Sequence, residues 1–139
     1  MAIYNKFSQF LEDVAHKVHN LGSDQLVVAL TNSSNPPVAG NSVLADLTEI
    51  AYTNLSSRNI TTSTSAETSG TYKLTLADLT LSATGAVATF RYVVVYNDTP
   101  TSPANPLIGW YDIGSDVTLA SGQNFLIDFD GANGFLTIV

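Results

Sequence analysis

The sequence predicts a mainly β protein, a jelly-roll-like β-sandwich with one N-terminal amphipathic helix. Short apolar runs separated by Gly, Pro, Asn and Ser recur along the 139 residues, as expected for many short strands joined by turns. Only 12% of the residues are charged, and Ser, Thr and Asn supply most of the polarity, which suits strand faces better than helix surfaces. The length and the absence of a linker predict a single domain over 1–139.

The predicted sheet is centred on the segment 89–113. Aromatic residues at positions 90, 92 and 96 alternate with valines at 93 and 95, which predicts a strand with one aromatic and one valine-rich face. The Asn- and Pro-rich stretch 97–106 ends this strand, because proline lacks the N–H that a sheet ladder needs. A second apolar strand over 107–113 is expected to place Trp110 and Tyr111 on opposite faces.

The amphipathic helix is expected over about 5–21, and the sandwich over about 25–139. Asn5 is the expected N-cap, and Gly22 is the expected left-handed residue at the helix end. The apolar residues recur at three- and four-residue steps and form one narrow stripe: Phe7, Phe10, Leu11, Val14, Ala15, Val18 and Leu21. Such a stripe covers a single apolar surface, which belongs either to the chain's own sandwich or to a neighbouring subunit.

The remaining strands follow from local pattern. Strands are expected at 26–30, 71–76 and 79–81, and an apolar strand over 135–139 closes the chain. Strands at 117–119 and 125–129 are expected to form a hairpin around the turn residues 120–122. The segment 43–52 is compatible with either a strand or a helical turn. The Ser- and Thr-rich segment 54–70 is expected to be an exposed, strand-prone arm or long loop, suited to contact with another subunit.

Charge and composition limit the partners. The formal net charge is −7, and the five basic residues are scattered, which argues against a nucleic-acid partner because phosphate binding needs clustered Lys and Arg. No cysteine is present, so neither disulfides nor thiolate metal sites contribute. No apolar run approaches membrane-spanning length, and the first residues lack the apolar core of a signal peptide. The chain is therefore expected to fold as a soluble protein with no membrane partner.

Motifs with catalytic or metal-binding chemistry are weak. His16 and His19 follow Glu12 on the predicted helix, but zinc needs three or four converging ligands. The segment 128–134 resembles the start of a calcium loop, yet the chain ends before the required Glu, which favours a simple turn. The segment 112–115 resembles the aspartic-protease tetrapeptide, but Ile113 replaces the hydroxyl residue. We expect no catalytic residue, no bound metal and no cofactor, and hence a protein that is not an enzyme.

Apolar and aromatic side chains are the remaining candidates for function. Aromatic residues beside Gly and Asp either belong to the sandwich core, stack on a sugar ring or anchor a protein interface. The residues expected at an interface are Phe7, Phe10, Trp110, Tyr111 and Ile138.

Five blocks of the sequence, 4–7, 12–24, 68–74, 90–98 and 106–112, resemble small tailed-phage virion proteins. The likeness covers most of the chain and is weakest over 32–65. It implies a capsid cement, or decoration, protein that binds the major capsid protein on the outside of the icosahedral shell. The resemblance further implies a homo-oligomer, dimer or trimer, located on the outer surface of the virion after synthesis in the bacterial host cytoplasm. Two alternatives remain open: a carbohydrate-binding head-fibre or adhesion module that uses Trp110 and Tyr111, and a structural component of the tail.

Overall fold

The most apolar runs of the chain form a four-stranded antiparallel sheet. The computed structural model describes residues 3–139, and its strand order in this sheet is β1-β7-β6-β2. The strands are β1 (Tyr4–Lys6), β2 (Leu26–Thr31), β6 (Phe90–Asn97) and β7 (Leu107–Val117). Every residue of β2 is buried, as its unbroken apolar sequence requires. The two strands predicted at the centre of the sheet are confirmed as the neighbours β6 and β7.

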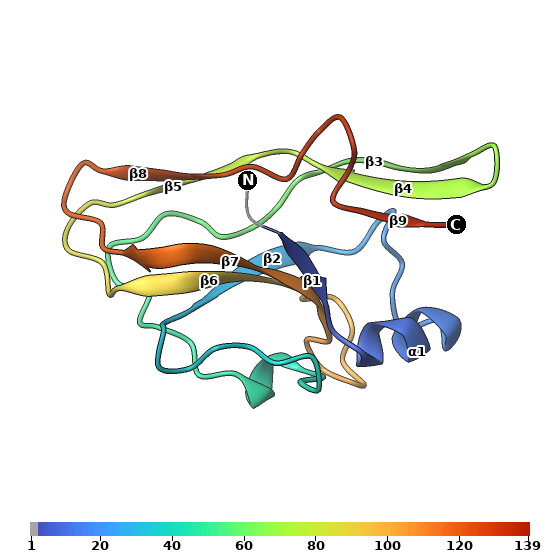
Figure 1. Cartoon of the computed structure of the whole chain (residues 1–139), viewed down its shortest axis with the longest axis horizontal. Helices are drawn as coiled ribbons and strands as arrows, with labels where there is room; N and C mark the ends of the chain where they lie inside the picture. The colour runs from blue at the N-terminus through green and yellow to red at the C-terminus, as the bar shows by residue number, and fades with distance from the viewer. Residues whose placement is uncertain (1–2) are drawn as a thin grey trace.

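The other strands lie across this sheet as a second layer (Figure 1). One part is the three-stranded sheet β3-β4-β9, and the other is the pair β5-β8. The bounds are β3 (Thr62–Thr68), β4 (Thr71–Leu76), β5 (Leu79–Ser82), β8 (Asn124–Ile127) and β9 (Leu136–Ile138). All strand pairs are antiparallel, and the predicted mainly β class with one helix is confirmed.

The main core fills the space between the two layers. It joins Val28 and Leu30 of the first layer to Leu74, Leu76 and Leu81 of the second. Each fully buried leucine of this kind contributes about 1.5–3 kcal/mol through removal of apolar surface from water. A smaller cluster lies on the opposite face of the first layer, where a loop containing the short 3-10 helix η1 (Leu44–Asp46) covers it. Of the two structures expected for the segment 43–52, a strand or a helical turn, the chain thus forms the helical turn.

The expected aromatic face of β6 is interrupted. Register shifts occur between Phe90 and Tyr92 and again between Val95 and Tyr96. The change of face in β6 lies between Phe90 and Val93, at the first of these shifts, because both side chains pack in the main core although they are three residues apart. From Val93 onward the alternation is regular, so Val95 packs in the main core and Tyr96 in the smaller cluster on the other face.

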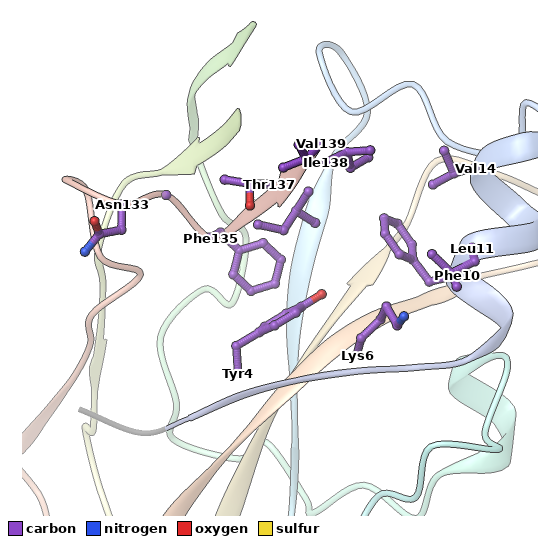
Figure 2. Close-up of a pocket in the computed structure, with 12 residues that line it drawn as sticks. Tyr4, Lys6, Phe10, Leu11, Val14, Asn133, Phe135, Thr137, Ile138 and Val139 are labelled. Atoms are coloured by element: carbon purple, nitrogen blue, oxygen red, sulfur yellow. The ribbon is translucent and has the colours of Figure 1, made fainter. Parts of the chain in front are cut away.

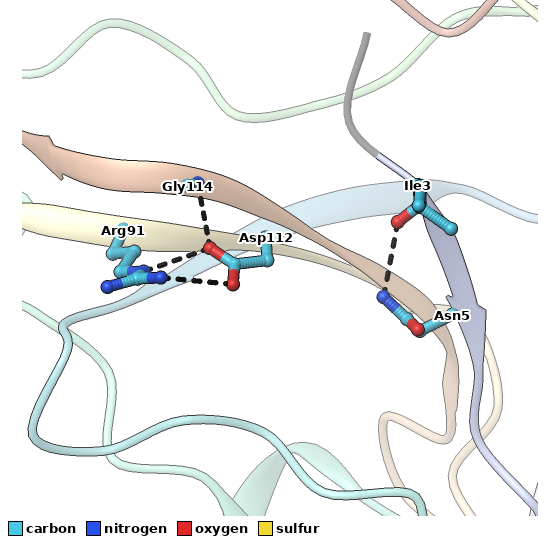
Figure 3. A network of polar contacts seen from close by, with 5 residues as sticks. All are labelled: Ile3, Asn5, Arg91, Asp112 and Gly114. Carbon is cyan, nitrogen blue, oxygen red and sulfur yellow. Dashed lines mark hydrogen bonds and ion pairs between the residues drawn. The ribbon is translucent and has the colours of Figure 1, made fainter.

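The helix is shorter than predicted. Residues 4–6 form β1, and Phe7 continues the ladder by donating its N–H to the Ile108 carbonyl (3.2 Å). Asn5 is therefore not an N-cap; its side-chain amide donates to the Ile3 carbonyl (3.1 Å; Figure 3). Helix α1 spans Gln9–Ala15 and ends before Lys17, whose φ of 64° is left-handed, so Gly22 is not its end. In a helix that began near residue 5, the first backbone N–H groups would have no partner within the helix. Pairing with β7 gives this part of the chain backbone hydrogen bonds instead.

The predicted hairpin around residues 120–122 is wrong. Strand β8 pairs with β5 rather than with the strand that precedes the turn. The chain leaves the first layer at Val117 and enters the second layer at Asn124. On the way, the Val87 N–H donates to the Leu119 carbonyl (3.0 Å), and the Gly122 N–H to the Ala83 carbonyl (2.8 Å). The local turn signal was correct, but the strand partner depends on distant residues.

Candidate functional site

The two layers are closed along one side of the molecule. There the segment 50–61 covers the outer edge of β2: the Val28 N–H donates to the Arg58 carbonyl and the Ile60 N–H to the Leu26 carbonyl, both at 2.9 Å. Ile60 is buried in the main core. Of the predicted exposed arm 54–70, this first part is thus a partly exposed cover, whereas β3 and the tip that joins it to β4 are exposed over most of their length.

The opposite side, which we call the open side, is bounded by strand edges. Strands β1, β9 and β8 are outermost in their sheets (Figure 1). Strand β1 pairs with only three residues of β7, Gly109 to Tyr111. Within the described part of the chain, no strand therefore pairs with the outer edge of residues 112–117. Unpaired edges of this kind are where sheet proteins accept partners or must be protected from them.

An aromatic cluster seals the middle of the open side. The Tyr4 ring contacts Phe135 edge-on (centroids 5.1 Å apart) and Tyr111 (6.1 Å), and Phe129 contacts Phe135 (5.8 Å). Burial raises the pKa of Tyr111 to about 12, with the charges of Asp128 and Asp130 adding to the effect. Burial also raises the pKa of Tyr4 well above its ordinary value. These rings are therefore packing elements held neutral.

Gly109 makes room for this cluster. A Cβ atom built on Gly109 would overlap the ring of Tyr4, which lies across β7 at this point. A glycine inside a strand commonly marks such a close approach of another group. The absence of a side chain at position 109 thus lets β1 bring Tyr4 against the strand.

A groove of about 600 Å³, which we call the α1 groove, lies on one flank of the aromatic cluster. It runs between α1, β1 and β9 (Figure 2). Its rim carries exposed apolar side chains from the helix and the C-terminal strand, and Lys6 from β1. The exposed apolar residues are Leu11, Val14, Ile138 and Val139.

A ridge with a small hollow lies on the other flank. The hollow, of about 280 Å³, is lined by residues of β6, β7 and β8, including Ile113 and Phe125, and by Asp128 directly after β8. Leu126 borders it and is 58% exposed. We call Leu126 together with Asp128 the β8 ridge. Among residues 3–139, seven large apolar side chains are exposed. Four of them line the α1 groove, and a fifth, Leu126, belongs to the β8 ridge.

The five expected interface residues have different surroundings. Phe7, Phe10 and Tyr111 are buried within the chain itself, so in this conformation they offer almost no surface to a partner. Trp110 is half-buried, and its ring packs against Phe7 with centroids 4.5 Å apart. Ile138 is exposed on the rim of the α1 groove. Trp110 and Tyr111 do lie on opposite faces of β7, as expected, but both rings are engaged in the chain's own packing.

The motifs that resembled catalytic sites have structural explanations. Asp112 accepts two hydrogen bonds from Arg91, Nε to Oδ1 at 2.9 Å and Nη2 to Oδ2 at 3.2 Å, and one from the Gly114 N–H (2.8 Å; Figure 3). These bonds, chiefly those from Arg91, hold the pKa of Asp112 below its usual value. An Asp fixed as a carboxylate in this way links β6 to β7.

The metal-like motifs also resolve into local contacts. His19 lies beyond the end of α1, away from its predicted place on the helix. In the segment 128–134, Asp130 accepts hydrogen bonds from the backbone and side chain of Asn133 (3.1 and 2.8 Å), as in a turn. Residues 3–139 contain no group of three His, Cys, Asp or Glu side chains placed to hold a metal ion.

Several residues of the open side were not singled out from the sequence. Lys6, Leu126 and Asp128 acquire their importance only because β1 and β8 are edge strands. The run Phe125-Leu126-Ile127 did contain a signal, since three consecutive apolar residues place an apolar side chain on both faces of a strand. One of those faces, that of Leu126, is the exposed one.

Comparison with known proteins adds no relative. No family model, no curated protein and no solved structure matches this chain. In the described part of the chain, no helix has both the length and the apolar character needed to span a bilayer.

Proposed function

We propose that this chain is a non-enzymatic structural virion protein: a capsid cement or decoration protein that binds the outside of an icosahedral shell. In this proposal the β layers are a jelly-roll-like sandwich, the partners are the major capsid protein and further copies of the chain, and the location is the outer surface of the virion. Two surfaces support the proposal. The open side, where exposed apolar side chains and unpaired strand edges are concentrated, suits contact with further copies of the chain. The exposed edge strand β3 suits contact with the shell.

A decoration protein acts by binding other proteins and does not need to catalyse a reaction. A body whose two layers share a buried core keeps its surface features at fixed distances. Each contact with the shell is then allowed to be weak, because an oligomer that touches several shell subunits binds all of them at high effective concentration. The acidic, Ser- and Thr-rich remainder of the surface keeps the free protein dispersed before it binds.

We assign the shell contact to the outer face of β3 and its tip. Strand β3 is exposed over most of its length and lies at the edge of its sheet. Its side chains are those of Ser and Thr apart from Ala66 and Glu67, and only Glu67 is charged. A partner strand or loop is therefore able to approach this edge closely without displacing charged groups.

The first experiment mixes the purified protein with shells that lack it. We expect saturable co-sedimentation and a higher temperature of shell rupture. Electron microscopy of bound antibody should label the head. A label on the tail would replace the proposal with a tail component, and an absence of binding to any virion part would contradict it.

The second experiment locates the contact. Thr64→Arg adds a bulky charge to the exposed face of β3 and should weaken shell binding by roughly tenfold or more, because the charge must be desolvated in the contact. Thr53→Arg makes the same change at an exposed position of the segment 50–61, away from β3 and the open side, and should bind as the unmodified protein does. Equal binding by both variants would remove β3 from the contact without removing the function. Deleting the whole segment 54–70 is a poorer test, because Ile60 and the cover of β2 would be lost with it.

A further inference from the structure

We propose that the open side pairs with the open side of a second copy of this chain about a twofold axis. In this pairing the β8 ridge of each copy enters the α1 groove of the other. The inference rests on the proposed function, because it specifies the oligomer that the decoration protein forms.

The two flanks of the open side carry opposite charge. Lys6 lines the α1 groove. The ion pairs found within residues 3–139 involve His16, Arg58 and Arg91 rather than Lys6. Asp128 lies on the β8 ridge, where one of its carboxylate oxygens accepts the Asp130 N–H (2.8 Å). A twofold axis in the contact exchanges the two flanks, so it places Lys6 of each copy opposite Asp128 of the other. Charge complementarity of this kind fixes the register of two surfaces and disfavours the alternatives.

The shapes of the two flanks correspond as well. The β8 ridge projects the exposed side chain of Leu126, and the α1 groove has apolar walls from Leu11, Val14 and Ile138. The two sites lie on either side of the cluster that contains Tyr111 and Tyr4, since Tyr111 lines the hollow and Tyr4 lines the groove. The axis accordingly passes near this cluster. A groove and a ridge on one copy thus become two equivalent contacts in the pair.

Pairing also protects the strand edges. Strands β1, β8 and β9 are outermost strands beside exposed apolar residues, a combination that soluble chains usually cover or break with charge. A second copy with the same surface covers all of these edges at once. A closed twofold contact buries the open sides of both copies and leaves β3 on each copy free to contact the shell.

The test is sedimentation equilibrium of the purified full-length protein in the absence of shells. We expect a dimer whose dissociation constant rises roughly tenfold or more in Lys6→Glu and in Asp128→Lys, because each change places like charges opposite one another. The double variant Lys6→Glu/Asp128→Lys restores opposite charges across the axis and should return to within about threefold of the unmodified protein. Asp98→Lys makes the same charge change at an exposed position after β6 and should leave the dimer unchanged. Circular dichroism checks that each variant is folded.

A protein that stays monomeric, a trimer, a dimer that neither charge reversal weakens, or a double variant that is not restored would overturn the pairing. The shell-binding experiment separates this failure from failure of the proposed function. A monomer that still binds shells contradicts only the pairing, and a charge-dependent dimer that binds no virion part contradicts only the function.

Discussion

His19 shows how one side chain is fitted between elements. Its Nδ1 accepts a hydrogen bond from the Asn97 side-chain amide (3.0 Å), and its ring packs against Phe10 with centroids 5.2 Å apart. Its Nε2 is buried without a partner in the described residues. Burial lowers the pKa of His19 below the ordinary value of 6.5, and the nearby charges of Asp13 and Asp24 oppose this only in part. The folded chain therefore holds this imidazole neutral.

Lowering the pH should destabilise the fold through His19. Since the pKa is lower in the folded state, the unfolded chain binds more protons below about pH 6.5, and the free energy of unfolding falls there. We expect a loss of stability in urea titrations from about pH 7.5 to about pH 5.5. His19→Asn should flatten this dependence, whereas His16→Asn, at an exposed position, should preserve it. An unchanged slope in His19→Asn would contradict the assignment.

Strand β2 shows how an element depends on its cover. Six consecutive buried residues make it the most enclosed strand of the first layer, yet it is an edge strand in the sheet order. The segment 50–61 resolves this conflict by hydrogen-bonding along the outer edge, and the Tyr52 hydroxyl accepts the Leu30 N–H (2.9 Å). A Ser- and Thr-rich stretch thus performs a structural task that its composition does not suggest.

Ile60→Ala should test this cover. Ile60 is 4% exposed, so its truncation should lower the free energy of unfolding by about 2–5 kcal/mol through lost burial and the cavity left behind. The neighbouring exposed residue offers a matched control: Thr61→Ala should change stability by about 0.5 kcal/mol or less. Urea denaturation measures both. Similar small effects in the two variants would show that the segment does not anchor β2.

At the scale of the whole molecule, the layers are interdependent. The main core takes residues from the four-stranded sheet and from both sheets of the second layer. Neither layer keeps its apolar face out of water when the other is removed. Stability is therefore a property of the pair of layers rather than of either one.

Thermal unfolding should consequently be a single transition. We expect calorimetric and van't Hoff enthalpies to agree, with an unfolding enthalpy on the order of 100 kcal/mol near 60 °C for a chain of this length. Measurements at low protein concentration and in the charge-reversed variants separate unfolding from dissociation of the proposed dimer. Two resolved transitions in the monomer would contradict a single cooperative domain.

The sequence by itself determined the mainly β class, the two central strands, the position of most other strands and the presence of one N-terminal helix. These features follow from local periodicity and turn chemistry, which act within a few residues. The apolar spacing of residues 7–21 overstated the helix, because that spacing cannot show that residues 4–7 pair with β7.

Only the tertiary structure decided which strands are neighbours, which edges stay unpaired and which apolar side chains remain exposed. Phe10 and Leu11 are adjacent in sequence, yet Phe10 is buried in the core and Leu11 is exposed. The physical reason is that strand pairing and burial are set by contacts between residues far apart in the chain. The joint role that we propose for Lys6 and Asp128 depends in the same way on the arrangement of both layers.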